Sequence, residues 1–443
     1  MAPSASASTK QEVTFEAPRD LLNASKRSQT FDEIAAFGVR SLRVVLYWRD
    51  VAPNAESRIR PKADLADPAS YDWAKYQPIL DEAQSRGFRV LLTVTSPAPT
   101  WATKGARDDG VTRPSPDRFR EFVTAVSGQF GSKVARYSFI NEPNLPQFLK
   151  PQYENGKAVS PLIYRGLYDA ALRGLKVAGD TKPVLMGETA PNGAAPRTVA
   201  PVVFLRGALC LNSQYKRVGG CTQLRVDGWA HHAYTRREGP LVNVPERLVT
   251  VGVLPRLTEA LDRAAKVGAV KRKLPVFLTE FGIQSEPDRL LGVPFQQQNE
   301  FRAISEKIAY DNPRVAAFSQ YLMTDDVTGS GGFESGLRSA GGVNKPAYDG
   351  FRLPVVAELR GSSVRLWGLV RPAGGPVNVT IQRRTGSGAW KSTGSTVTSS
   401  RGIWTSKSSN VKSGSWRVTW VAPDGTTYES PGVRAYSWPT RLR

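Results

Sequence analysis

The sequence contains little cysteine, little histidine and no long apolar run. Its 443 residues include two Cys and two His, too few thiolate and imidazole ligands for an ordinary zinc site. No stretch approaches the roughly 20 apolar residues that a membrane-spanning helix needs. Residues 1–10 lack the charged start and apolar middle of a secretory signal. We therefore expect no metal, no cofactor and no transmembrane segment.

The two cysteines, Cys210 and Cys221, flank a polar stretch with the composition of a loop. A disulfide that closes this loop fits better than two separate buried thiols, and such bridges occur mainly in exported proteins. We therefore expect a secreted or extracytoplasmic monomer whose signal peptide has been removed. Residues 1–10 are expected to form a disordered segment.

Acidic residues are outnumbered, since 60 Lys and Arg against 39 Asp and Glu give a net charge of +21. Residues 355–443 carry 13 Lys and Arg against 3 Asp and Glu, a net of +10, on a fifth of the chain. No nucleic-acid-binding motif accompanies this charge. Attraction to an anionic polysaccharide or a cell envelope is therefore the favoured interpretation, and binding of nucleic acid is not expected.

Up to residue 354, short β-branched or aromatic runs alternate with amphipathic stretches of helical length. This pattern indicates repeated βα units around a parallel sheet, and eight strands predict a closed (β/α)8 TIM barrel over residues 11–354. The expected strands are residues 12–16, 41–47, 88–94, 136–140, 183–186, 226–232, 275–279 and 315–322. Helix starts are expected at Thr30 with Glu33, at Ser115 and at Ser160.

Residues 355–443 have short alternating runs separated by Gly, Ser and Pro, which predict a small all-β sandwich of the immunoglobulin-like type. This segment holds six of the ten tryptophans. They could stack on sugar rings, but packing in the core is favoured because a domain of this size needs large side chains to fill it.

Two carboxylates directly follow apolar runs that are expected to be barrel strands. Residues 137–144 read YSFINEPN and residues 276–285 read VFLTEFGIQS, which puts Glu142 and Glu280 at strand ends. Catalytic groups of a (β/α)8 barrel gather at the carboxyl ends of its strands. We therefore predict that these two residues are catalytic.

The Asn-Glu-Pro after the fourth expected strand and the Thr-Glu-Phe-Gly after the seventh resemble the clan A glycoside hydrolases, most nearly families 39 and 5. The resemblance implies that Glu142 is the acid/base, that Glu280 is the nucleophile and that Asn141 binds the sugar 2-hydroxyl. It also implies retention through a covalent glycosyl intermediate, with the carboxyl groups about 5 to 5.5 Å apart. Substrates of such families include β-xylosides, β-glucans and matrix polysaccharides.

The same resemblance extends to groups around the nucleophile. The His-x-Tyr pattern that ends the sixth expected strand is similar to that of the clan and implies that Tyr234 supports Glu280. His232 shares its strand face. Arg43 is similar to the arginine that keeps the nucleophile ionised, although an ion pair elsewhere in the barrel is the alternative. His231 points to the helix layer and is expected to be structural.

Other residues near the expected strand ends are weaker candidates for lining a sugar pocket, because an aromatic ring at a barrel rim belongs to the core as often as to the site. These candidates are Glu16, Trp48, Trp101, Tyr321 and Asp326. The chain lacks the histidine that is frequent after strand three of the clan and the tryptophan that is frequent after strand eight, so sugar and linkage stay open. A non-catalytic carbohydrate-binding or envelope-attachment protein on a decayed barrel is the alternative function.

Overall fold

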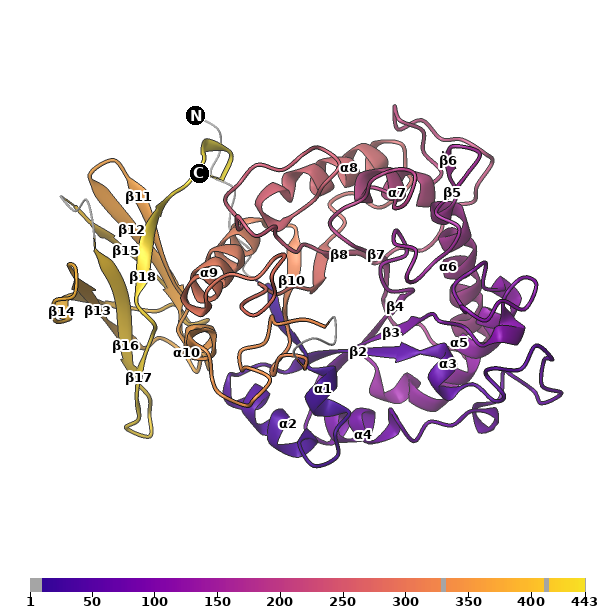
Figure 1. Ribbon diagram of the computed structural model, residues 1–443, viewed down its shortest axis with the longest axis horizontal. Helices are drawn as coiled ribbons and strands as arrows, with labels where there is room; N and C mark the ends of the chain where they lie inside the picture. Colours follow the sequence, from indigo (N-terminus) through magenta and orange to yellow (C-terminus); the bar gives the residue numbers. More distant parts are fainter. Residues whose placement is uncertain (1–9, 328–331, 410–413, 443) are drawn as a thin grey trace.

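The computed structural model describes residues 10–327, 332–409 and 414–442. Eight parallel strands close into a barrel that is surrounded by helices and followed by a mostly antiparallel β domain (Figure 1). This architecture confirms the predicted TIM barrel with a C-terminal all-β domain. The predicted disordered segment lies outside the described residues, except for its last residue.

Neighbouring barrel strands follow the chain order, and β1 closes the barrel by pairing with β10. The strands are β1 (Glu12–Glu16), β2 (Ser41–Tyr47), β3 (Arg89–Thr95), β4 (Arg136–Phe139), β7 (Val184–Thr189), β8 (Gly228–His232), β9 (Val276–Glu280) and β10 (Val315–Tyr321). Most are buried along nearly their whole length, because helices cover the outside of the barrel and side chains fill its inside. Each predicted strand therefore corresponds to an observed one.

The helices pack around the barrel, and a short hairpin of β5 (Tyr153–Glu154) and β6 (Lys157–Ala158) lies in the loop after β4. The helices are α1 (Pro18–Leu21), α2 (Arg27–Ala36), α3 (Trp48–Val51), α4 (Gln77–Ser85), α5 (Pro116–Phe130), α6 (Ser160–Val177), α7 (Pro201–Ala208), α8 (Pro255–Lys266), α9 (Phe295–Asp311) and α10 (Pro346–Arg352). Of the described residues, none forms a helix long and apolar enough to cross a membrane.

α5 and α6 begin where the sequence predicts, but only Ser115 caps its helix. Ser115 caps α5, and its side chain accepts a hydrogen bond from the Arg118 amide. Thr30 lies inside α2, which begins one turn earlier, and its hydroxyl donates to the Lys26 carbonyl. Ser160 is the first residue of α6, and its hydroxyl donates to the side chain of Gln152 at 3.0 Å. The hydroxyls of Thr30 and Ser160 therefore do not cap a helix, because each donates to another partner.

The C-terminal domain consists of two groups of strands that share one apolar core. The strands are β11 (Val355–Arg360), β12 (Ser363–Leu369), β13 (Asn378–Arg384), β14 (Lys391–Val397), β15 (Ile403–Ser408), β16 (Ser415–Val421), β17 (Thr427–Glu429) and β18 (Val433–Ser437). β18 pairs with β16 on one side and with β11 on the other, so it connects the two groups. Five of the six tryptophans of this domain are at most 4% exposed, which agrees with packing in the core.

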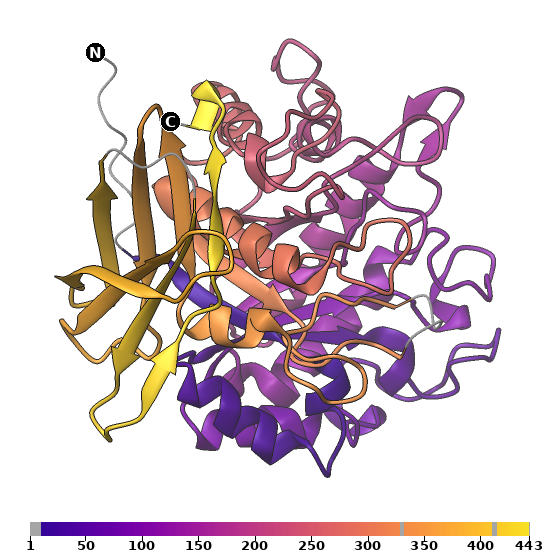
Figure 2. The ribbon, with the colours of Figure 1, turned by 60° about the vertical axis from the view of Figure 1, so that its left-hand side comes forward.

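The β domain lies beside α9 and α10 (Figures 1 and 2). Trp367 and Trp438 belong to the same hydrophobic cluster as the barrel core. Glu306 on α9 forms buried ion pairs with Arg302 of the same helix and with Arg371 of the β domain. Apolar packing and a buried ionic network therefore join the two parts.

The loop after α7 contains the predicted disulfide, which joins Cys210 and Cys221. Cys210 has a φ of 53°, so the chain turns sharply where the bridge begins. The bond closes the loop that leads toward β8.

Candidate active site

The turn after β4 holds Glu142 in a backbone conformation that residues other than glycine rarely adopt. Ile140 and Glu142 have φ angles of 58° and 39°, in the left-handed region. Two hydrogen bonds of 2.9 Å hold the turn: the Asn141 amide donates to the Thr95 hydroxyl, and the Glu142 amide donates to the Glu188 carbonyl. Such strain persists only where the surroundings enforce it, and it often marks functional sites.

Glu280 is the last residue of β9, and each of its carboxylate oxygens has a donor. The Tyr234 hydroxyl donates to Oε1 at 2.7 Å, and Arg43 Nη1 donates to Oε2 at 2.9 Å. Tyr234 and Arg43 therefore fix the position of both carboxylate oxygens of Glu280.

Arg43 lies at the centre of the cluster, and its side chain is fully buried. Its guanidinium donates to Glu16 Oε2 at 2.7 Å, Glu280 Oε2 at 2.9 Å, Asn141 Oδ1 at 2.6 Å and Glu188 Oε2 at 3.1 Å. The structure thus brings Arg43 to Glu280, the contact expected from the sequence, while its role stays a prediction. The planar guanidinium holds residues from four different strand ends in fixed positions.

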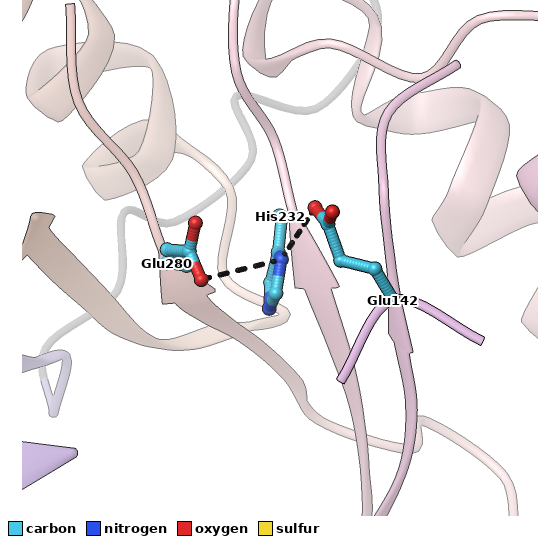
Figure 3. Close-up of side chains that lie close together, drawn as sticks. All are labelled: Glu142, His232 and Glu280. Atoms are coloured by element: carbon cyan, nitrogen blue, oxygen red, sulfur yellow. Dashed lines mark hydrogen bonds and ion pairs between the residues drawn. The ribbon is translucent and has the colours of Figure 1, made fainter. Parts of the chain in front are cut away.

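His232 lies between the two predicted catalytic carboxylates (Figure 3). Its Nδ1 is 2.9 Å from Glu142 Oε1 and 3.6 Å from Glu280 Oε2. Its Nε2 is 2.7 Å from Glu188 Oε2. Burial alone would lower the pKa of His232, but the charges of these carboxylates outweigh burial and raise the pKa to about 10. The carboxylates around the ring therefore favour its charged form at neutral pH.

Glu142 and Glu280 approach each other closely, since one carboxylate oxygen of each lies within 4.8 Å of the other. Burial raises the pKa of Glu142, and the hydrogen bond from His232 opposes that rise. The two groups thus have different surroundings: burial favours a proton on Glu142, whereas Glu280 accepts hydrogen bonds from Arg43 and Tyr234.

Glu188 belongs to the cluster, but the sequence analysis did not identify it. Its side chain is fully buried at the end of β7, where Gly187 has a φ of 117° and the register with β8 shifts. A Cβ at Gly187 would lie 2.5 Å from the Ala230 carbonyl oxygen, so this bulge requires glycine. Burial would raise the pKa of Glu188, but Arg43 and His232 lower it to about 2.

Glu16 ends β1 and pairs with Arg43, so the structure brings this weaker candidate into the cluster. Burial raises the pKa of Glu16 to about 7, the charge of Arg43 opposes the rise, and the charge of Glu280 adds to it. Glu16 is thus the third carboxyl group that pairs with Arg43, after Glu188 and Glu280. Its own charge changes near neutral pH.

Aromatic rings border the cluster on the side of β10. Tyr321 is half-buried, and burial and the charges of Glu280 and Glu16 raise its pKa well above the usual range. Phe333, which the sequence analysis missed, contacts Tyr321 and Tyr234 with ring centroids 5.2 and 5.8 Å apart. Asp326 accepts a hydrogen bond from the Phe333 amide at 2.8 Å and so supports the loop of this ring.

Trp48 and Trp101 lie in the hydrophobic core. Trp48 begins α3, is 1% exposed and stacks on Phe122 with centroids 5.0 Å apart. Trp101 packs edge-on against Trp48, and its indole donates to the Pro53 carbonyl at 3.1 Å. The short helix after β2 turns Trp48 toward α5. A contact of either ring with sugar stays a prediction.

His231 has the structural surroundings that its strand face predicts. Its ring nitrogens lie 2.9 Å from the Thr189 hydroxyl and 2.7 Å from the Val249 carbonyl. Burial lowers the pKa of His231 to about 4, so its ring is neutral when that of His232 is charged.

The cluster also has the spacing of a cation site, because Glu142, His232 and Glu280 each offer a ligand atom within 4.8 Å of the others. Arg43 donates to Glu280 at 2.9 Å, and both nitrogens of His232 already face carboxylates. A metal ion would have to displace these hydrogen bonds and would lie beside the guanidinium charge. These residues therefore fit a cluster of hydrogen-bonded, ion-paired side chains better than a metal centre.

The sequence matches no protein-family model and no curated protein. The GH39 enzyme from Xanthomonas axonopodis pv. citri aligns with a TM-score of 0.53 at 14% identity, over 92% of this chain and 93% of that enzyme. A GH39 β-xylosidase from Caulobacter crescentus gives 0.51 at 17% identity, over 86% and 84% of the two chains. A bacterial orthologue of human α-L-iduronidase gives 0.51 at 12% identity, over 97% and 88%. The chain is therefore structurally similar to GH39 enzymes and related clan A glycoside hydrolases, with which it shares a closed eight-stranded barrel.

Proposed function

We propose that this protein is a retaining glycoside hydrolase with Glu142 as acid/base and Glu280 as nucleophile. The observation that carries the proposal is the separation of these carboxylates, whose oxygens approach within 4.8 Å. Retaining enzymes hold the two groups about 5 to 5.5 Å apart, whereas inverting enzymes leave roughly 6.5 to 9.5 Å for a water molecule. The short separation supports a double displacement.

In the first step, Glu280 attacks the anomeric carbon, the bond to the leaving oxygen breaks, and Glu142 gives its proton to that oxygen. In the second step, Glu142 takes a proton from water as the water oxygen attacks the anomeric carbon, and the bond to Glu280 breaks. The raised pKa of Glu142 supports its role as an acid. Arg43 and Tyr234 support the negative charge of Glu280.

The substrate is proposed to be an oligosaccharide or polysaccharide. Arg43 donates to the amide oxygen of Asn141, which leaves the amide NH2 to donate to a sugar hydroxyl. Tyr321 and Phe333 would form a wall of the sugar pocket. Because the similar structures include a β-xylosidase and an α-L-iduronidase orthologue, aryl β-xylosides, β-glucosides and α-L-iduronides are the first compounds to screen.

We also propose that the enzyme acts outside the cytoplasm. The disulfide supports this location, since such bonds persist mainly in oxidising compartments. The net charge of +10 on residues 355–443 supports attraction to an anionic polysaccharide or cell envelope.

Removal of each carboxylate tests the proposed roles. Glu280→Ala is expected to lower kcat by about a thousandfold or more, because the covalent step is lost, and azide should restore turnover with inverted product. Glu142→Ala should slow substrates with poor leaving groups by about 10² to 10⁴ and largely spare dinitrophenyl glycosides, which need little protonation.

Glu121→Ala is the control, since Glu121 pairs with Arg118 on α5. Unchanged hydrolysis by Glu280→Ala would overturn the proposal. Glycan binding by the wild type without product release would favour the carbohydrate-binding alternative.

A further inference from the structure

We propose that Glu188 is a positioning residue for the acid/base: it holds His232 so that the ring donates a hydrogen bond from each nitrogen, one to Glu188 and one to Glu142. The inference deepens the proposed hydrolase function and rests on it for the role of Glu142. Glu188 itself would not touch the sugar, because its side chain is fully buried behind the ring.

The contacts of Glu188 make this residue a two-point support for Glu142. Its carboxylate lies 2.7 Å from His232 Nε2, and the Nδ1 of the same ring lies 2.9 Å from Glu142 Oε1. Its backbone carbonyl accepts the hydrogen bond of the Glu142 amide at 2.9 Å. One residue thus holds both the strained backbone and, through a ring, the carboxyl group of Glu142.

The neighbours of Glu188 Oε2 favour an ionised carboxylate that accepts their hydrogen bonds. Arg43 Nη2 donates to Oε2 at 3.1 Å, and the Thr279 hydroxyl donates to the same oxygen at 3.0 Å. An ionised carboxylate accepts hydrogen bonds only. The proton between Glu188 and His232 must therefore belong to Nε2, which leaves Nδ1 to face Glu142.

A charged ring at this place helps an acid that must give up its proton. When Glu142 has protonated the leaving oxygen, its carboxylate can accept a hydrogen bond from Nδ1–H of the imidazolium. A neutral ring with its proton on Nε2 would instead point a lone pair at that carboxylate. Without the charge of Glu188, we expect the ring to lose its second proton more easily and the ionised Glu142 to be less stable.

The titratable groups around His232 come from several strands of the barrel, and most of them are acidic. They are Glu16, Arg43, Glu142, Glu188, His231 and Glu280. Arg43 opposes a charge on the ring, His231 would do so only when protonated, and the carboxylates favour it. Of the carboxylates, Glu188 makes the shortest contact with His232, at 2.7 Å.

The chain contains only two histidines, so NMR of protein labelled at the histidine ring nitrogens tests the inference directly. In the wild type at pH 7.5, His232 should carry protons on both nitrogens while His231 is neutral and serves as an internal reference. Glu188→Gln should move the titration of His232 to lower pH by about 1 to 3 pH units, the usual effect of one opposite charge. A neutral His232 in the wild type would overturn the inference.

Kinetics of Glu188→Gln separate positioning from simple damage to the fold. The variant should lose about tenfold or more in kcat/KM on a substrate with a poor leaving group and little on a dinitrophenyl glycoside, because only the former needs an acid. Equal losses on both substrates with an unchanged His232 titration would contradict the inference.

Glu300→Gln is a matched control, because Glu300 is equally buried and binds Arg434 and Tyr436 at the β domain. It should leave the His232 titration and the ratio of the two substrates unchanged. The NMR measurement requires no activity, so the inference about His232 and the hydrolase function can fail separately.

Discussion

At the residue scale, the site is a group of four carboxylates arranged around one guanidinium and one imidazole. Such a cluster is stable only if the charges compensate one another, because burying an unpaired charge is costly. The pKa values reflect this compensation. The pKa of Glu188 is lowered to about 2, whereas the pKa of Glu16 is raised to about 7. Their opposite shifts predict different dependences of stability on pH.

Glu16 should make the folded protein less stable as pH rises toward neutrality. Its pKa of about 7 exceeds the ordinary 4.5, so folding binds a proton between these values. The stabilisation is fully present below about 4.5 and is lost as pH rises through 7, with an upper limit of about 3 kcal/mol. In urea unfolding from pH 4.5 to 6.5, the stability of the wild type relative to Glu16→Gln should therefore fall as pH rises.

His231 and Glu142 also titrate in this window, but they do so in both proteins, so the difference in stability between the two proteins isolates Glu16. Glu188, with a pKa of about 2, loses its contribution below 4.5, and His232, with a pKa of about 10, loses its contribution above 6.5. Parallel curves for Glu16→Gln and the wild type would contradict the assigned titration of Glu16.

At the element scale, the strands were predictable because parallel barrel strands are continuous apolar runs that end at polar loops. β1 and β2 match their expected residues, and Glu142 and Glu280 follow from the strand ends. The sequence pattern did not predict Glu188, because the bulge at Gly187 breaks the alternation of the strand and extends β7 to Thr189, beyond its expected end. It did not predict Phe333 either, because tertiary packing, not periodicity, brings the loop of this ring to Tyr234 and Tyr321.

The loop between α7 and β8 should depend on its disulfide. Closing a loop of this length lowers the conformational entropy of the unfolded chain, which stabilises the folded protein by about 3 kcal/mol. The double variant Cys210→Ser, Cys221→Ser should therefore melt at a lower temperature than the oxidised wild type. Dithiothreitol should lower the melting temperature of the wild type and leave that of the variant unchanged; equal melting of oxidised protein and variant would contradict this expectation.

At the scale of the whole molecule, the barrel and the β domain should unfold together. Glu306, 3% exposed, links Arg302 of α9 to Arg371 of the β domain. Glu306→Ala would leave two buried guanidinium groups without this partner, which typically costs about 3 to 5 kcal/mol. We expect one calorimetric transition for the wild type, shifted as a whole to lower temperature in the variant.

Glu33→Ala removes a more exposed ion pair with Arg338 within the barrel and should have a smaller effect. Two separate transitions, of which only one responds to Glu306→Ala, would show that the parts fold independently.

The stereochemistry of the reaction tests the central proposal most directly. Proton NMR can follow the anomeric signal of the first sugar released from an aryl glycoside, before mutarotation mixes the anomers. Glu142 and Glu280, with carboxylate oxygens within 4.8 Å, predict that the product has the same anomeric configuration as the substrate. A product of inverted configuration would contradict the assignment of Glu280 as nucleophile.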